Sequence, residues 1–219
     1  MTLLIFDCDG VLVDSEVLAH DTLIEMMASL GRPITMDEAV REFAGGSLAD
    51  TIATAGRLLG RPLPADVGGH FGRLLLERLR QELKPMPGVR DAILALPYRR
   101  AVASSSTPER LRLSLEVTGL APLFGEHVFS AVQVARGKPA PDLYLLAARM
   151  LGEAPERCVV IEDTTRGVVA GRAAGARVIG FAGGGHATPA LADQLRRAGA
   201  EALITEMREL PAVVRRLAG

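Results

Sequence analysis

The sequence predicts an α/β fold, a doubly wound, Rossmann-like parallel sheet core with an inserted helical cap domain. Two observations support this prediction. Short apolar runs recur along the chain and helical patterns separate most of them, as expected for parallel strands buried on both faces. The interval 15–83 has helical patterns but no convincing strand. A chain of 219 residues is long enough for one such core and a smaller insert.

Six apolar runs are expected to form strands: Leu3–Phe6, Ala101–Ser104, Val128–Ser130, Val159–Ile161, Val178–Phe181 and Ala202–Ile204. Helix starts are also legible. Thr107 is a candidate N-cap before Pro108, and proline is favoured at the first helical position. Gly167, Gly171 and Gly175 repeat every four residues, which predicts a helix packed closely on the sheet.

The inserted segment has its own helix signals. Thr35 and Glu38 have capping-box spacing, and Gly45-Gly46 interrupts the chain before a helix that begins near Ser47. The prolines that follow Lys84 indicate a stiff connection back to the core. We expect the core to comprise residues 1–14 and 84–219, and the helical cap to comprise residues 15–83.

Charge and hydropathy argue against two classes of protein, those that bind nucleic acid and those that bind or span a membrane. With 25 basic and 26 acidic residues the formal net charge is −1, which argues against nucleic-acid or anionic-membrane binding. No apolar stretch reaches the length of about 18 residues that a transmembrane helix needs. Cys8 and Cys158 lie in or beside apolar runs without metal-ligand spacing, so we expect buried, reduced thiols. We expect a cytoplasmic protein that is a monomer or weak dimer.

Acidic residues follow two of the expected strands. Asp7 and Asp9 come directly after the first strand, with Gly10 allowing a sharp turn, and Glu162-Asp163 ends the fourth. Ligands bind at the carboxyl ends of strands in open α/β sheets. If these strands are neighbours, the carboxylates converge and need a cation, and oxygen ligands favour Mg²⁺. The alternatives are an acidic loop and, for the second pair, an N-cap acid.

A second set of residues has phosphate-binding character. Ser104 ends the strand that begins at Ala101 and Ser105 follows it, and Lys138 lies between Gly137 and a proline before a helix. Hydroxyl groups, backbone N–H groups at a helix N-terminus and a lysine charge suit a phosphate. The alternative for the serines is helix capping. Lys138 is one of only two lysines in the chain, the other being Lys84.

Four segments in order, Asp7-Cys8-Asp9-Gly10, Ser104, Lys138 in Gly-Lys-Pro-Ala-Pro-Asp, and Glu162-Asp163, resemble the motifs of haloacid dehalogenase-like hydrolases. The whole chain resembles the members with a helical cap after the first strand, which include β-phosphoglucomutases and sugar-phosphate phosphatases. The resemblance implies that Asp7 attacks phosphorus to form an aspartyl phosphate and that Asp9 is the general acid and base.

The resemblance also implies the binding residues. Mg²⁺ would be held by Asp7, Asp163 and the backbone carbonyl of Asp9, with Glu162 a direct or indirect ligand. Ser104, Ser105 and Lys138 would hold the phosphoryl oxygens. The substrate would be a small phosphorylated metabolite, a sugar phosphate or similar phosphomonoester. Cap residues expected to face its leaving group are Ser15, Glu16, Gly45, Gly46, Ser47 and Leu48.

Several activities remain open. In β-phosphoglucomutases a cap-hinge histidine and a cap-loop arginine help to hold the bisphosphorylated sugar, and Ala19 and Leu48 occupy those positions here, with His20 one place away. This difference favours water as the phosphoryl acceptor over a mutase reaction. Dehalogenases of the family lack the second acid of the first motif, so Asp9 favours phosphate-ester chemistry. A receiver-like, non-enzymatic phosphoacceptor is disfavoured by Asp9 and by the cap.

Overall fold

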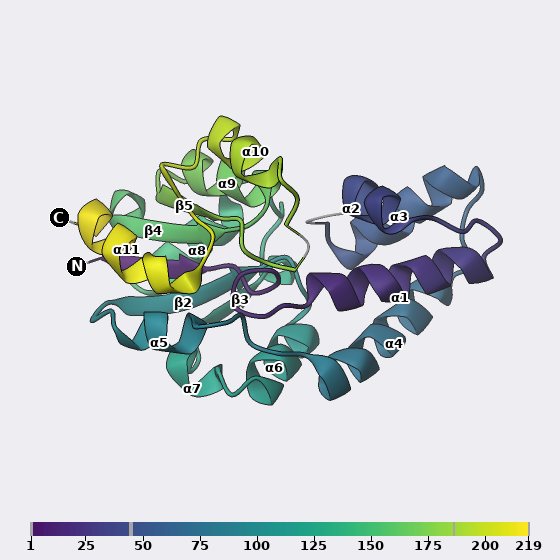
Figure 1. The fold of residues 1–219 in the computed structure, drawn as a ribbon, viewed down its shortest axis with the longest axis horizontal. Helices are drawn as coiled ribbons and strands as arrows, with labels where there is room; N and C mark the ends of the chain where they lie inside the picture. Colours follow the sequence, from purple (N-terminus) through teal and green to yellow (C-terminus); the bar gives the residue numbers. More distant parts are fainter. Residues whose placement is uncertain (1, 44–45, 186, 219) are drawn as a thin grey trace.

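The computed structural model describes residues 2–43, 46–185 and 187–218. Its core is one six-stranded parallel sheet in the order β3-β2-β1-β4-β5-β6 (Figure 1). The strands are β1 (Leu3–Phe6), β2 (Arg99–Ser104), β3 (Val128–Ser130), β4 (Cys158–Glu162), β5 (Arg177–Phe181) and β6 (Ala202–Ile204). The predicted fold class is confirmed, and three of the strands extend beyond the expected runs by one or two residues.

Helices cover both faces of the sheet. The α-helices of the core are α5 (Val89–Leu94), α6 (Pro108–Val117), α7 (Ala121–Phe124), α8 (Asp142–Met150), α9 (Thr165–Ala173), α10 (Leu191–Arg197) and α11 (Leu210–Ala218). Three short 3-10 helices span Ala131–Gln133, Pro155–Arg157 and Met207–Glu209. Leu4 and Phe6 of β1 pack in the layer that contains α5, α6, α7 and α11, whereas Leu3 and Ile5 pack with α8, α9 and α10. Because both faces are buried, the strands are continuously apolar.

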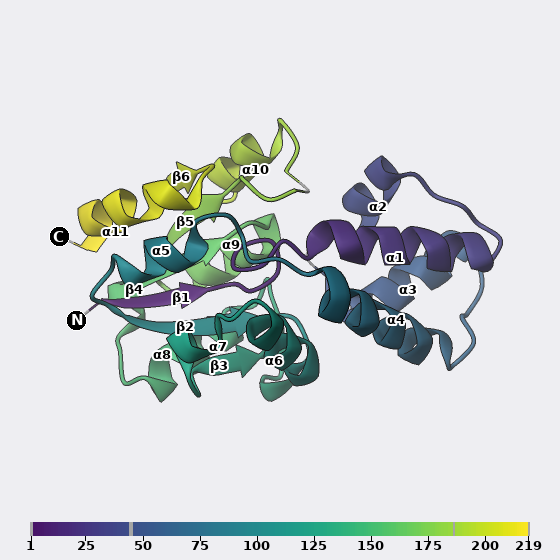
Figure 2. The same ribbon diagram turned by 60° about the horizontal axis from the view of Figure 1, so that its bottom comes forward.

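Four helices form a separate group beside the core: α1 (Glu16–Ser29), α2 (Met36–Phe43), α3 (Leu48–Leu59) and α4 (Val67–Glu82). Figure 2 shows them side by side, beyond the end of β1. The two segments that join them to the core run together, because Asp14 N donates to Lys84 O at 3.1 Å and Met86 N donates to Leu12 O at 2.9 Å. The structure describes no strand within residues 15–83 outside the gap at 44–45.

Local signals account for several helix ends. The Thr107 hydroxyl accepts a hydrogen bond from Arg110 N at 3.3 Å, and Pro108 is the first residue of α6. Ser47 and Asp50 form a capping box at the start of α3. The Thr35 hydroxyl accepts from Glu38 N at 3.2 Å, but the Glu38 carboxylate pairs with Arg32, so that capping box is only half formed.

Close packing of α9 on the sheet requires two of the glycines that repeat in the sequence. A Cβ atom on Gly171 would lie 2.8 Å from a methyl carbon of Val178, and one on Gly167 would lie 1.8 Å from Glu162 Oε1. The predicted close approach of this helix is therefore confirmed. Within the described ranges, no helix has the length and apolar character needed to cross a membrane.

Candidate active site

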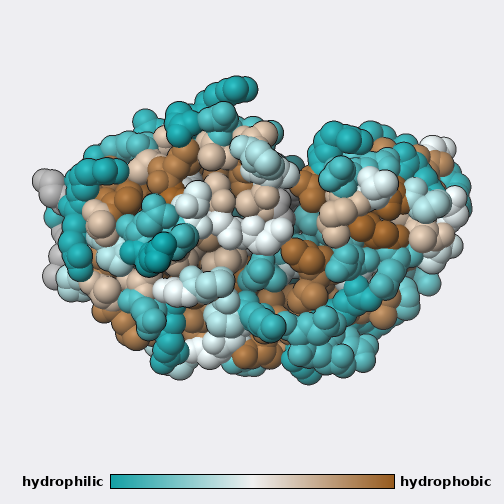
Figure 3. Space-filling view, in the orientation of Figure 1, coloured by the Kyte–Doolittle hydropathy of each residue, from teal (hydrophilic) through white to brown (hydrophobic). Residues whose placement is uncertain are grey.

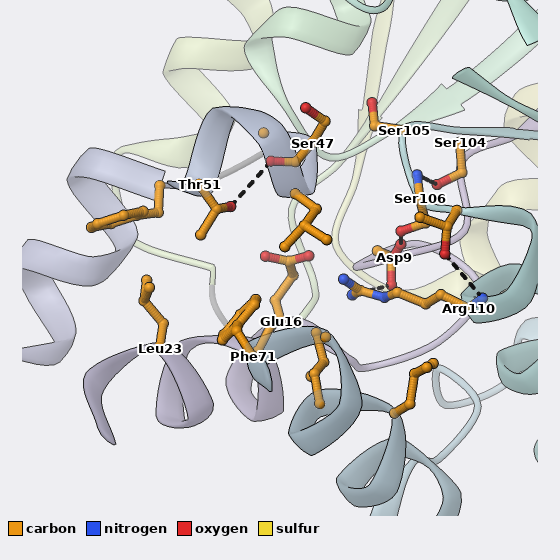
Figure 4. Close-up of a pocket in the computed structure, with 18 of the residues that line it drawn as sticks. Asp9, Glu16, Leu23, Ser47, Thr51, Phe71, Ser104, Ser105, Ser106 and Arg110 are labelled. Carbon is orange, nitrogen blue, oxygen red and sulfur yellow. Dashed lines mark hydrogen bonds and ion pairs between the residues drawn. The ribbon is translucent and has the colours of Figure 1, made fainter. Parts of the chain in front are cut away.

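A cavity of about 310 Å³ lies between the sheet's carboxyl edge and the four cap helices (Figure 4). Its core side is polar and is lined by Asp7, Asp9, Ser104, Ser105, Ser106, Arg110, Lys138 and Thr164. Its cap side includes Glu16, Ala19, His20, Leu23, Gly46, Ser47, Leu48 and Phe71. A polar floor beneath a mainly apolar roof suits a ligand with a charged end and a less polar remainder.

Asp7 is held at the base of this cavity by the end of β1. Its backbone N–H continues the hydrogen bonding of the sheet by donating to Ile161 O at 3.0 Å. This bond fixes the position of the Asp7 backbone, from which the side chain extends. One carboxylate oxygen accepts from Cys8 N at 2.7 Å, and the other lies 3.0 Å from Lys138 Nζ. Burial raises the pKa of Asp7, and the nearby acids Glu162 and Asp163 raise it further, although the Lys138 ammonium opposes them.

Lys138 lies between two acids. Its Nζ donates to Glu162 Oε1 at 2.5 Å as well as facing Asp7, and it lies 5.0 Å from the ring centroid of Tyr144. The side chain is almost fully buried, at 2 % exposure. Burial alone would lower the pKa of Lys138, but Asp7 and Glu162 outweigh burial and raise it. The neighbouring acids therefore favour the charged form of Lys138.

Glu162 is fully buried and its carboxylate is already used by protein donors. Oε1 accepts from Lys138 and from the Tyr144 hydroxyl at 2.7 Å, and Oε2 accepts from the hydroxyl and backbone N–H of Thr164 at 3.0 and 3.1 Å. Burial favours the neutral acid, yet the Lys138 charge and these hydrogen bonds lower the pKa of Glu162. The carboxylate anchors Lys138 rather than facing an open position.

Asp7, Glu162 and Asp163 form a buried acidic cluster whose nearest oxygens all lie within 4.8 Å of one another. Lys138 supplies one positive charge beside these three carboxyl groups. Ionising all of them at once requires another cation, and oxygen donors in this number suit a hard divalent ion. Burial and, to a smaller degree, the neighbouring acids raise the pKa of Asp7. The residues present therefore fit Mg²⁺, with Asp7 and Asp163 better placed as ligands than Glu162.

Asp9 is held by three donors on the wall of the cavity. Oδ1 accepts from the Ser15 hydroxyl and from Arg110 Nη2, each at 2.6 Å, and Oδ2 accepts from the Ser106 hydroxyl at 2.5 Å. Burial alone would raise its pKa, but Arg110 and the two hydroxyl groups lower it. Gly10, with φ of 73°, makes the turn that brings Asp9 to this position.

Most residues predicted for the site lie together. Ser104 is 2 % exposed, lines the cavity with Ser105, and accepts a hydrogen bond from Ser106 N at 3.2 Å. In the cap, residues lining the cavity include Glu16, Gly46, Ser47 and Leu48. Ser15 is instead fully buried and binds Asp9, so its hydroxyl is not directed at a ligand. Gly45 lies outside the described residues.

His20 has a more central position than the sequence indicated. It is 3 % exposed, lines the cavity, and its Nε2 lies 3.9 Å from Glu16 Oε2. Ala19 lines the cavity beside it. His20 therefore lines the cavity, one residue after Ala19, which occupies the position of the cap-hinge histidine of β-phosphoglucomutases.

Sequence reasoning missed two residues of the site, Arg110 and Tyr144. Figure 4 shows the Arg110 side chain extending past Asp9 toward Glu16, so its guanidinium group reaches into the cavity wall. A signal for Arg110 was present, because a cation in the first turn of a helix opposes the helix dipole and indicates a nearby acid. A buried tyrosine hydroxyl likewise needs a partner, and Tyr144 donates to Glu162.

A parallel, doubly wound α/β core with buried acids at the carboxyl edge of its sheet, covered by an inserted helical cap, is the architecture of an enzyme with a Rossmann-like core and a helical cap. The comparison with protein families agrees, since residues 1–175 match the haloacid dehalogenase-like hydrolases. The chain belongs to this family. The family and enzyme class predicted from the sequence are therefore confirmed.

Individual relatives cover most of the chain. Hexitol phosphatase A of Escherichia coli is 35 % identical over 184 residues, covering 80 % of each chain. The 6-phosphogluconate phosphatase of the same organism is 28 % identical over 185 residues, covering 84 % of each. Among solved structures, a haloacid dehalogenase-like protein of unknown function from Agrobacterium tumefaciens is 39 % identical, with a TM-score of 0.88 over the full length of both chains.

Proposed function

We propose that this protein is a Mg²⁺-dependent phosphatase that hydrolyses a small sugar phosphate through an aspartyl-phosphate intermediate on Asp7. The observation that carries the proposal is the buried contact between Asp7 and Lys138, 3.0 Å apart at the base of a cavity that Asp9 also lines. This contact holds a carboxylate nucleophile beside a cation that can hold a phosphoryl oxygen.

In the first step, an Asp7 oxygen attacks phosphorus while the bond from phosphorus to the leaving oxygen breaks. Lys138 and the hydroxyl groups of Ser104 and Ser105 hold the phosphoryl oxygens as charge redistributes between them. Asp9 gives a proton to the leaving alcohol, and because Arg110 lowers its pKa, Asp9 has to take up this proton in a substrate-bound arrangement in which the Arg110 contact is weakened. General acid catalysis of this kind typically contributes about 10²- to 10⁴-fold.

In the second step, water attacks the phosphorus of the aspartyl phosphate, Asp9 accepts its proton, and the Asp7 carboxylate and inorganic phosphate are released. The contacts of Asp9 with Arg110 and Ser106 favour the ionised carboxylate, which is the form this step requires. The cap limits access of bulk water while the leaving group is present.

Asp7, Asp163 and the backbone carbonyl of Asp9 would hold Mg²⁺, while Glu162 acts through Lys138. A bound metal would neutralise the acidic cluster and would supply Lewis-acid stabilisation to the phosphoryl group. It would also keep Asp7 ionised, since burial and the neighbouring acids otherwise favour the protonated form.

The relatives and the cavity support the proposed substrate class. Two relatives are named for 6-phosphogluconate and for hexitol phosphatase activity, both of which concern phosphorylated sugar derivatives. A cavity of about 310 Å³ has room for such a compact molecule. Glu16, Ser47 and Leu48 line the cap side, where the leaving group would lie.

The test is a screen for Mg²⁺-dependent phosphate release across sugar phosphates, polyol phosphates, phosphoglycolate and nucleotides. We expect release from one or more sugar or polyol phosphates, abolished in Asp7→Asn and retained in Asp21→Asn, a matched change on α1. Full turnover by Asp7→Asn would exclude Asp7 as nucleophile. Conversion of glucose 1-phosphate to glucose 6-phosphate without net phosphate release would replace the phosphatase proposal with a mutase.

A further inference from the structure

Arg166, in the first turn of α9, connects the core to the cap on the side of the cavity away from the hinge. Its Nη2 donates to the backbone carbonyl of Lys138 at 2.7 Å and lies 3.4 Å from Asp50 Oδ2 in α3. The two side chains are partly exposed, at 39 % for Arg166 and 48 % for Asp50. One guanidinium group therefore contacts both the loop that carries Lys138 and the cap.

The cap end of this contact is firmly attached to the cavity wall. Asp50 Oδ2 accepts from the backbone N–H and the hydroxyl of Ser47, at 2.9 and 3.0 Å. Gly46, Ser47 and Leu48 line the cavity, and a Cβ atom on Gly46 would lie 3.1 Å from the Cβ atom of Asp50. A movement of Asp50 therefore moves the part of the cap that faces the ligand.

The core end is attached to the phosphate side of the site. The backbone that accepts from Arg166 belongs to Lys138, whose ammonium group lies between Asp7 and Glu162. The cap also contacts the core elsewhere, since α4 packs against α6 next to the hinge. The space-filling view shows a notch between the two lobes (Figure 3), so the cap has an open side where a contact can form or break.

We propose that Arg166 and Asp50 form a latch. The latch holds the cap closed over the core and fixes the position of the Lys138 backbone relative to the cap. The pair is a positioning device, because neither side chain touches the reacting atoms. A partly exposed ion pair changes an equilibrium by only about 1.5- to 5-fold. That size suits a contact that must break in every turnover to release product. The link to catalysis rests on the proposed function, whereas the latch itself can be tested without turnover.

The first test is a double-mutant cycle on kcat/KM with Asp50→Asn, Arg166→Gln and the double variant. We expect a fall of about 2- to 5-fold for Asp50→Asn, from loss of the ion pair, because the amide oxygen of the substituted side chain can still accept from Ser47. A larger fall is expected for Arg166→Gln, which also loses the Lys138 carbonyl contact, and the double variant should be no worse than Arg166→Gln. Additive losses, or an unchanged Asp50→Asn enzyme, would overturn the latch.

A matched control is the ion pair between Arg57 and Glu42, which lies wholly within the cap. Arg57 Nη2 is 2.9 Å from Glu42 Oε2. Glu42→Gln removes the partly exposed ion pairs of Glu42 with Arg57 and Arg41 without touching the core, so it should leave kcat/KM within the error of wild type. A loss equal to that of Asp50→Asn would show that the effect comes from cap charge in general. Thermal melts of all variants should show that each is folded at the assay temperature.

The second test measures cap closure directly by spin-label distance distributions between the cap and the core. Labels are placed at Arg61→Cys and Arg149→Cys, both exposed, while the native Cys8 and Cys158 are buried and stay unlabelled. With Mg²⁺ and inorganic phosphate as the probe, Asp50→Asn and Arg166→Gln should shift the distribution to longer distances. High salt should shift wild type in the same direction.

Identical distributions in wild type and both variants would exclude a latch. The outcome is separable from the proposed function. A wild-type protein that closes through Arg166 but releases phosphate from no substrate would overturn the phosphatase proposal and leave the latch standing. An active phosphatase whose cap–core distance distribution is unchanged by both substitutions would overturn the latch and leave the phosphatase proposal standing.

Discussion

Removing the Lys138 charge should destabilise the folded protein as well as stop turnover. The ammonium lies 3.0 Å from Asp7 and 2.5 Å from Glu162, and its side chain is 2 % exposed. Removing one partner of a buried ion pair costs about 3–5 kcal/mol, because the remaining charge is left uncompensated. Here the remaining acids also repel one another. Lys138→Met should therefore lose a large part of a total stability of about 5–15 kcal/mol.

The assay is urea unfolding followed by circular dichroism, with and without Mg²⁺. The control is Lys84→Met, since Lys84 is the other lysine of the chain and is exposed. It should change the free energy of unfolding by less than about 0.5 kcal/mol. Mg²⁺ should stabilise Lys138→Met more than wild type, because it replaces part of the missing charge, yet it should not restore turnover.

The substitution Lys138→Arg distinguishes the effect of the positive charge on turnover from the effect of the side chain's shape. The substitution keeps the positive charge, but a planar guanidinium fork has to fit where a compact ammonium is enclosed by Asp7, Glu162 and Tyr144. Overpacking of this kind costs about 1–3 kcal/mol. Turnover should fall by about 10²-fold or more, as for loss of a donor to a transition-state oxyanion. Near-normal turnover, or a Lys138→Met protein as stable as wild type, would refute the electrostatic argument.

Three further changes probe the rest of the site. In the metal-free protein, the raised pKa of Asp7 means that its carboxyl group contributes stability below its ordinary pKa, and that this contribution is lost as pH rises through the folded value. Mg²⁺ needs the carboxylate, so the rise in Tm on adding Mg²⁺ should be larger at about pH 8 than at about pH 5; equal rises would contradict this. Arg110→Gln should slow turnover by about 10- to 100-fold by releasing Asp9, whereas Arg112→Gln, exposed on the same helix, should not; equal rates in steady-state assays would exclude a role for Arg110. Gly167→Ala should impair turnover because its Cβ collides with Glu162, while Gly171→Ala, which collides with Val178, should lower Tm and preserve turnover; full activity in Gly167→Ala would mean that α9 can shift at no cost.

The sheet could be predicted from the sequence because each strand is buried on both faces and is therefore a continuous apolar run. Leu3–Phe6 is fully buried along its length, so its boundaries coincide with those of the run. The convergence of Asp7 with Glu162-Asp163 depended on one further condition, that their strands be neighbours. The pairing of Phe6 with Ile161 meets that condition, and it is a property of the crossover connections rather than of either segment.

The partners of these acids could not be predicted in the same way, because they come from side chains distant in sequence. Ser106 and Arg110 reach Asp9 across 97 and 101 residues, respectively. Ser15 was expected to face the leaving group from the resemblance to capped relatives. The structure directs its hydroxyl to Asp9 instead, because the tight loop after β1 folds Asp9 back toward the hinge.

One local signal nevertheless marks the arginines that the motif analysis passed over. Arg110 and Arg166 both lie in the first turn of a helix that follows a strand, where the dipole disfavours a cation by about 0.3–1 kcal/mol. Each is offset by an acid brought from elsewhere, Asp9 for Arg110 and Asp50 for Arg166. A first-turn arginine at the carboxyl edge of a parallel sheet thus indicates an acidic partner across the site. In this chain one such partner belongs to the reacting centre and the other to the cap, so the two arginines connect the chemistry of the core to the closure of the cavity.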